Sequence, residues 1–78
     1  MQTTILVVED EKKLADILAD YLRQADYRVD CLYRGDGVLQ HITEHPPAAV
    51  LLDLMLPGVD GISLCRDIRQ HSSVPILS

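Results

Sequence analysis

Acidic residues follow two of the most apolar runs in the sequence, and carboxylates in such positions can do chemistry. Glu9 and Asp10 come directly after the run Ile5-Leu6-Val7-Val8, and Asp53 stands at the end of the apolar run that begins at Ala48. Charged residues are rarely left in apolar strands without a partner or a function. We therefore predict that these three acids belong to a site at the edge of a buried sheet.

Three carboxylates in one place favour a bound cation. At separations of about 4 to 5 Å, like charges repel by a few kcal/mol at an effective dielectric near 20, so the cluster needs a counter-ion or a proton. Mg²⁺ accepts carboxylates, waters and a phosphate as oxygen ligands, and the carbonyl of Met55 lies two residues past Asp53. With its charge neutralised, the carboxylate of Asp53 could form an aspartyl phosphate.

The order of the elements predicts how these acids are positioned. Apolar and alternating runs indicate strands near residues 3–8, 27–32, 48–53 and 74–78, with helices near 11–25, 36–45 and 62–71 between them. Strands that alternate with helices through short turns require parallel pairing, so the predicted fold class is α/β, a doubly wound parallel sheet with helices on both faces. If the first and third strands are neighbours, with the strand at 27–32 on the flank, the acids meet at a topological switch point.

Each helix is predicted from an apolar stripe and from residues at its ends. The first should begin with an acidic turn, Asp36 should cap the second, and Pro46-Pro47 should end it. The stripes are Leu14, Ile17, Leu18, Tyr21 and Leu22 in the first helix, Val38, Leu39 and Ile42 in the second, and Ile62, Cys65 and Ile68 in the third.

Composition limits the classes of function. The chain has 78 residues, of which 47% are hydrophobic, so it can form one small domain. Its net charge of −5 argues against nucleic-acid binding by this segment. Cys31 and Cys65 are too few for a disulfide scaffold. No leader-like or bilayer-spanning run is seen, so we expect a cytoplasmic protein with no membrane partner.

Several spaced motifs resemble the receiver domain of bacterial two-component response regulators. The motifs are Val7-Val8-Glu9-Asp10-Glu11, Leu51-Leu52-Asp53-Leu54-Met55-Leu56-Pro57-Gly58, Asp60-Gly61 and Val74-Pro75-Ile76, and the resemblance spans about Ile5 to Leu77. The sequence is most similar to the winged-helix, DNA-binding class of these regulators, and Leu64-Cys65-Arg66 resembles the envelope-stress subgroup.

The resemblance implies a flavodoxin-like receiver with strand order 2-1-3-4 and assigns roles to the acids. Asp53 would be the phosphoacceptor, Asp10 would bind Mg²⁺ directly, Glu9 would assist through water, and Met55 would offer its backbone carbonyl. Pro57 and Gly61 would shape the loop. A sensor histidine kinase would donate the phosphoryl group, so the chain is not expected to be an enzyme with a substrate of its own. A separate output domain, not in this chain, would bind promoter DNA.

The resemblance also implies that residues 1–78 are a partial receiver. A family receiver continues with a switch hydroxyl, a fourth helix, a fifth strand followed by a lysine, and a fifth helix. Ser78 falls two residues short of the hydroxyl position and is interpreted as an ordinary strand residue, while Lys12 and Lys13 sit on the first helix. An uncovered strand edge invites pairing, so we expect a homodimer or a strand-exchanged oligomer.

Three other kinds of protein share part of this pattern. A phosphohydrolase of the haloacid dehalogenase type needs a second acid two residues after the nucleophile, where Met55 stands. A dinucleotide-binding domain needs a glycine-rich turn where Glu9-Asp10-Glu11 stands. A receiver-like fragment that takes no phosphate and serves only in dimerisation or interaction remains open.

Two histidines offer a weaker signal. His41 and His45 are four residues apart on the second predicted helix, so both could touch one metal ion. No third ligand has a suitable spacing in the sequence, and we interpret them as a surface pair.

Overall fold

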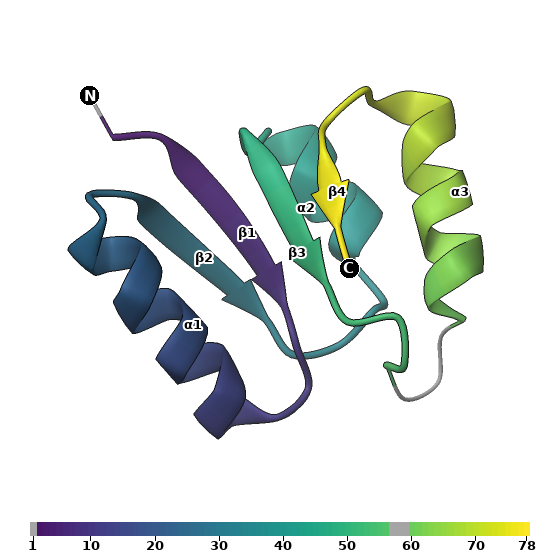
Figure 1. Cartoon of the computed structure of the whole chain (residues 1–78). Coiled ribbons are helices and arrows are strands. Elements are labelled where there is room, and N and C mark those ends of the chain that lie inside the picture. Colours follow the sequence, from purple (N-terminus) through teal and green to yellow (C-terminus); the bar gives the residue numbers. More distant parts are fainter. Residues whose placement is uncertain (1, 57–59) are drawn as a thin grey trace.

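The chain forms a four-stranded parallel sheet with helices on both sides (Figure 1). The computed structural model describes residues 2–56 and 60–78. Its elements are β1 (Thr4–Val8), α1 (Lys12–Gln24), β2 (Arg28–Leu32), α2 (Val38–Glu44), β3 (Ala49–Leu52), α3 (Gly61–His71) and β4 (Ile76–Leu77). The strand order is β2-β1-β3-β4 and every pairing is parallel. The predicted fold class and the strand order 2-1-3-4 are confirmed.

Alternate residues of the central strands point to the two faces of the sheet. On β1, Leu6 and Val8 pack on the side of α2 and α3, and Val7 packs on the side of α1. The first cluster contains Leu6, Val8, Val38, Ile42, Val50, Leu52, Leu56, Leu64, Ile68 and Val74, and the second contains Val7, Ala15, Ala19 and Val29. As predicted, β1 and β3 are central and β2 is an edge strand.

Helix α1 packs on the sheet through small residues, which differs from the predicted stripe. Ala15 and Ala19 are buried and Leu18 and Leu22 are partly buried against them. The other three residues of the stripe stay exposed: Leu14 by 39%, Ile17 by 53% and Tyr21 by 72%. The two alanines let the helix approach the sheet closely, and this turns the longer side chains outward.

Among the described residues, no helix is long and apolar enough to cross a membrane.

The beginnings of α1 and α2 also differ from prediction. Glu11 is the extended residue before α1, so the acids precede the helix, and its first turn contains none. Gly37 caps α2 in a left-handed conformation with φ +86°, and the side chain of Asp36 caps nothing. Asp36 instead accepts a hydrogen bond from Arg34 Nε at 2.9 Å, and this contact lowers the pKa of the Asp36 carboxyl. The turn leading into α2 therefore uses the freedom of glycine in place of an aspartate cap.

Helix α3 begins with a side-chain cap that positions it beside the end of β3. Asp60 accepts hydrogen bonds from Ile62 N at 3.0 Å and Ser63 Oγ at 3.1 Å, which satisfies a free backbone donor of the first turn. The helix buries Gly61, Leu64 and Ile68. Ile62, which the sequence placed on the buried stripe, is 60% exposed because the capped helix turns Leu64 inward in its place.

Candidate functional site

The ends of β1 and β3 bring the predicted acids together. Val8 is paired with Leu52, so Glu9 and Asp53 are the next residues on neighbouring strands. Asp53 N donates to Val8 O at 3.0 Å, and Glu9 N donates to Leu32 O at 3.0 Å. These backbone hydrogen bonds fix both residues just beyond the strand ends. The predicted meeting of the acids at this edge of the sheet is confirmed.

The three carboxylates form a compact cluster. One oxygen from each of Glu9, Asp10 and Asp53 can be chosen so that all lie within 4.8 Å of one another. Glu9 is buried, with 8% of its surface exposed, Asp53 is half-buried and Asp10 is exposed. The cluster therefore runs from the protein interior to solvent, as a site that admits a ligand from outside requires.

Backbone amides hold two of these carboxylates. Glu9 Oε2 accepts a hydrogen bond from Glu11 N at 3.1 Å, and Asp53 Oδ1 accepts one from Met55 N at 2.9 Å. The Met55 amide leaves the second carboxylate oxygen of Asp53 available for a ligand. Both side chains are thus oriented before anything binds.

Burial and crowding make this cluster favour a proton or a cation. Burial raises the pKa of Glu9, and the carboxyls of Asp10 and Asp53 raise it further, against the opposing effect of the Glu11 amide. Among the described residues, no ion pair involves these three acids. Within residues 2–56 and 60–78 the ion pairs are Arg34 with Asp36 and His41 with Asp30, both away from these acids.

The sequence matches the response regulator receiver domain family over residues 5–78. The chain belongs to this family. It is 53% identical over 73 residues to the transcriptional regulatory protein BaeR of Escherichia coli O6:H1, a match that covers 94% of this chain and 30% of that protein. The chain therefore spans about a third of the length of this relative.

Solved structures agree with the family assignment. The BeF3-activated N-terminal receiver domain of Klebsiella pneumoniae RstA matches with a TM-score of 0.89 and 42% identity, over 95% of this chain and 63% of that one. A structure from Chloroflexus aurantiacus J-10-fl matches with a TM-score of 0.91 and 38% identity, over 97% of this chain and 65% of that one. This receiver chain thus covers a little less than two thirds of either structure.

The loop after β3 of the receiver contains the other predicted site residues. Met55 is 87% exposed, and its amide rather than its carbonyl makes the contact seen with Asp53. The carbonyl of Met55 as a ligand stays a prediction, and Pro57 lies outside the described residues. A Cβ at Gly61 would overlap the Cα, carbonyl carbon and oxygen of Leu54. Glycine at 61 thus lets α3 start directly against the loop that follows Asp53.

An open hollow of about 250 Å³ lies next to the receiver's acids, on the α1 side of the sheet. Glu9, Asp53 and Ser78 line it with apolar residues of β1, α1, β3 and β4, namely Val7, Val8, Leu18, Leu51, Leu52 and Leu77. Ser78 is exposed and follows β4, which ends at Leu77, so the interpretation of Ser78 as a strand residue is wrong. Lys12 points elsewhere, with its Nζ 5.3 Å from the centre of the Tyr33 ring.

The donor set fits a small hard cation. All three side chains offer oxygen, carry like charge and sit where solvent can reach one side, which suits Mg²⁺ better than a metal that prefers nitrogen or sulfur. The fit rests on the chemistry and spacing of the carboxylates of the receiver. The cation's identity belongs to the proposal below.

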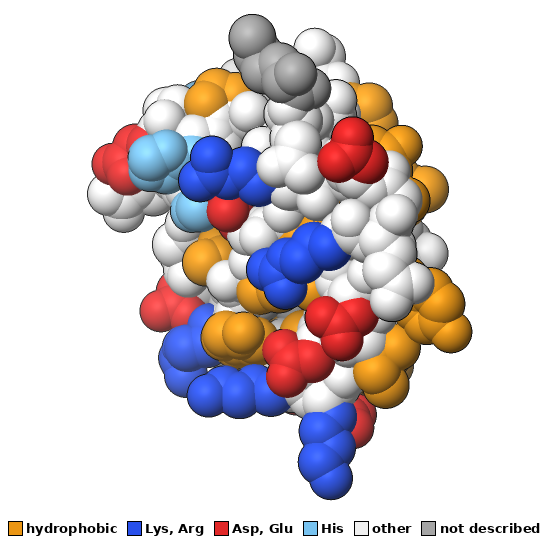
Figure 2. Space-filling model, turned by 90° about the vertical axis from the view of Figure 1, so that its left-hand side faces the viewer, with side chains coloured by type: hydrophobic (Ala, Val, Ile, Leu, Met, Phe, Trp, Pro, Cys, Tyr) orange, Lys and Arg blue, Asp and Glu red, His pale blue; other side chains and the backbone are white. Residues whose placement is uncertain are grey.

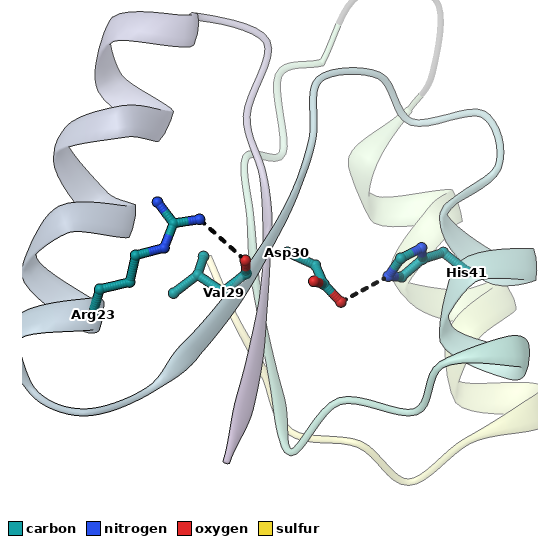
Figure 3. A network of polar contacts seen from close by, with 4 residues as sticks. All are labelled: Arg23, Val29, Asp30 and His41. Atoms are coloured by element: carbon teal, nitrogen blue, oxygen red, sulfur yellow. Dashed lines mark hydrogen bonds and ion pairs between the residues drawn. The ribbon is translucent and has the colours of Figure 1, made fainter. Parts of the chain in front are cut away.

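A second polar cluster was missed from the sequence. His41 Nε2 lies 3.4 Å from Asp30 Oδ2, and Arg23 Nη2 donates to Val29 O at 3.3 Å on the other side of β2 (Figure 3). His45 is exposed, as predicted for a surface pair, while His41 is partly buried and contacts a carboxylate. Asp30 and His41 lie on different elements, so their spacing in the sequence gave no signal.

Proposed function

We propose that this chain is the phosphoacceptor module of a two-component response regulator, and that Asp53 accepts a phosphoryl group from a phosphohistidine of a sensor histidine kinase. The carboxylate cluster of Glu9, Asp10 and Asp53 at the edge of β1 and β3 supports this proposal most directly. Family membership supports it independently.

Asp53 is suited to the nucleophilic role by its placement. Its Oδ1 is held by the Met55 amide, so Oδ2 can attack phosphorus. The P–N bond to the donor imidazole breaks as the Asp53 O–P bond forms, and its electron pair returns to the imidazole. Such transfers depend chiefly on positioning and charge neutralisation. The chain supplies positioning, while turnover depends on the kinase, so the chain is not an enzyme in its own right.

Asp10, Asp53, the Met55 carbonyl and, through water, Glu9 would hold Mg²⁺. When bound, the cation would neutralise the charge that the acids and the phosphoryl oxygens bring together. Asp10 is the exposed member of the cluster, so it can exchange water for a cation without a change in the sheet. Asp10→Ala should weaken Mg²⁺ binding strongly, and an unchanged Mg²⁺ titration would exclude Asp10 as a ligand.

The same proposal covers the DNA-binding output domain of the parent protein and its cellular compartment. A cytoplasmic parent protein would bind promoter DNA through an output domain, as the name of its regulatory relative suggests. This acidic segment would contact neither nucleic acid nor membrane. Phosphorylation would change dimerisation of the parent, and the chain by itself would form a homodimer or a strand-exchanged oligomer.

Intact-mass measurement with a small phosphodonor and Mg²⁺ tests the central claim. Wild-type chain should gain the mass of one phosphoryl group, more slowly than a complete receiver, and Asp53→Asn should gain none. Asp67→Asn, the same change at an exposed acid of α3, should label as the wild type does. Labelling that persists in Asp53→Asn would show that the acceptor lies elsewhere.

The second candidate is an interaction fragment that takes no phosphate. The exposed apolar residues of α1 and β4, among them Ile17, Tyr21 and Leu77, favour it. No mass gain in the wild-type chain, together with sedimentation that depends on concentration, would support this candidate over phosphorylation.

A further inference from the structure

The outer edge of β2 is open to another strand. β2 is the first strand in the order β2-β1-β3-β4, so no strand of the described residues pairs with its outer side. A hollow of about 520 Å³ reaches Val29 and Cys31 of β2 and is lined from both faces of the sheet, by Arg23 of α1 and His41 of α2. Figure 2 views the side of the molecule where α1 and β2 lie and shows basic, acidic and histidine side chains there. Solvent therefore reaches this edge, and charged groups flank it.

The backbone of β2 presents two residues to this open edge. The N–H of Arg28 donates to a carbonyl on the β1 side, and the carbonyl of Leu32 accepts from the residue after β1. Because the direction of the backbone groups alternates along a strand, the N–H and C=O groups of Val29 and Cys31 point outward. The Val29 carbonyl agrees with this direction, since it accepts a hydrogen bond from Arg23 Nη2 at 3.3 Å and not from β1. Unpaired groups of this kind are a template for another strand.

The side chains of β2 are complementary to a second copy of the same strand. Val29 and Cys31 pack on the α1 side, so Arg28 and Asp30 point to the α2 side. When two copies of β2 pair antiparallel with their Val29 residues opposite each other, Arg28 of each copy stands opposite Asp30 of the other. Opposite charges directly across two strands attract. The neighbouring register, with Asp30 opposite Asp30, brings like charges together and is disfavoured.

We propose that two copies of this chain associate through β2, in antiparallel pairing with Val29 at the two-fold axis. The proposal rests on the homodimer of the proposed function, names its interface, and is independent of phosphorylation at Asp53. Arg28 is exposed, and the ion pairs of the described residues do not include it. Asp30 Oδ2 lies 3.4 Å from His41 Nε2, which leaves Oδ1 for Arg28 of the other copy. The two-fold axis makes this contact twice.

Arg23 limits how strongly the two copies pair. Its guanidinium covers the Val29 carbonyl (Figure 3), and the second copy needs this same carbonyl, so pairing must displace Arg23. Charged side chains at a sheet edge commonly oppose pairing in this way. We therefore expect weak association in the wild-type chain. Arg23→Ala should strengthen it by about two- to tenfold, the net worth of one hydrogen bond.

Charge reversal, followed by analytical ultracentrifugation without a phosphodonor, tests this interface. Arg28→Asp alone sets acid opposite acid, and Asp30→Arg alone sets base opposite base. Each variant should therefore self-associate about tenfold more weakly than the wild type, because two attractive pairs become repulsive. An equimolar mixture of the two variants restores both opposite-charge pairs and should associate as the wild type does. Circular dichroism would show that each variant keeps its fold.

Arg66→Asp is the matched control. Arg66 is exposed on α3, at the far side of the sheet from β2 (Figure 1), so the same change of charge should leave association unchanged. A wild-type chain that is monomeric at every concentration would overturn both this interface and the proposed homodimer. A dimer that Arg28→Asp leaves unchanged, or a mixture that associates no better than the single variants, would overturn this interface alone. Phosphoryl labelling, measured by intact mass, reports separately on the role of Asp53.

Discussion

The two faces of the sheet are packed very differently. On the side of α2 and α3, branched aliphatic side chains from strands and helices form the larger buried cluster, with Ile68 and Val50 fully buried. On the side of α1, the cluster is smaller and the helix contributes alanines to it, while Ile17 on the same helix is 53% exposed. Most of the apolar burial that stabilises this chain therefore lies on one face.

Because of this difference, the face that stabilises the folded chain is not the face that presents large apolar side chains to solvent. Buried aliphatic groups contribute about 25 cal/mol per Å² removed from water, so the α2 and α3 face should dominate the free energy of unfolding. The α1 face and the end of β4 instead present large apolar groups to solvent next to the hollow that reaches Asp53. Substitutions of the same residue type on the two faces should have very different effects.

Ile68→Ala should have the largest effect. The side chain is fully buried in the larger cluster, and truncation of such a group costs about 2–5 kcal/mol through lost burial and the cavity left behind. Urea unfolding followed by circular dichroism measures the change. Ile68→Val should cost only about 0.5–1.5 kcal/mol. A loss of less than about 2 kcal/mol for Ile68→Ala would mean that this face is not the main source of stability.

Gly61→Ala should destabilise the same face from its edge. In a helix, alanine is normally better than glycine by about 0.8–1.0 kcal/mol. Here the added Cβ would overlap the backbone of Leu54, and overpacking of this kind costs about 1–3 kcal/mol. The sign of the change in the free energy of unfolding therefore shows whether helix propensity or the overlap with Leu54 dominates. A gain in stability would show that α3 and the loop after β3 do not approach so closely.

The sequence predicted the sheet and the acid cluster well because both follow from simple periodicity. Apolar runs at Ile5–Val8 and Val50–Leu52 mark buried strands, and parallel strands end at a common edge, so Glu9 and Asp53 had to come close once β1 and β3 were neighbours. The registers and hydrogen bonds that fix these residues could not be inferred, because they depend on the pairing of specific strands.

The packing of α1 and the surroundings of His41 were not predictable in the same way. The apolar residues of α1 include Leu18, which is partly buried, and Ile17, which faces solvent. Apolar periodicity alone does not show that the helix rests on its alanines. The contact of His41 with Asp30 joins two elements, and only the alternation along β2 could have indicated the side on which Asp30 lies.

Glu9→Gln should stabilise the metal-free chain at neutral pH, by less than either loss above. Because the pKa of Glu9 is raised above its ordinary value of 4.5, the folded chain binds the proton more tightly than the unfolded chain does. Stability should therefore fall as pH rises from about 4.5 through the folded pKa, and Gln should remove this dependence. Urea unfolding without divalent cations, at about pH 4.5 and at neutral pH, measures this change in the free energy of unfolding. Glu11→Gln is the control, and equal gains in both variants would contradict a specific role for Glu9.

Ile17→Ala should have the smallest effect and completes the comparison with Ile68→Ala. Ile17 is exposed on α1, and substitutions at such surface positions usually change stability by no more than about 0.5 kcal/mol. Urea unfolding at two protein concentrations measures the change, with Ile42→Ala, at a buried position of α2, as the costly counterpart. If Ile17→Ala instead cost as much as Ile42→Ala, and more so at higher concentration, the α1 face would be covered by a second chain in solution. The contrast between the two faces would then belong to the isolated chain alone.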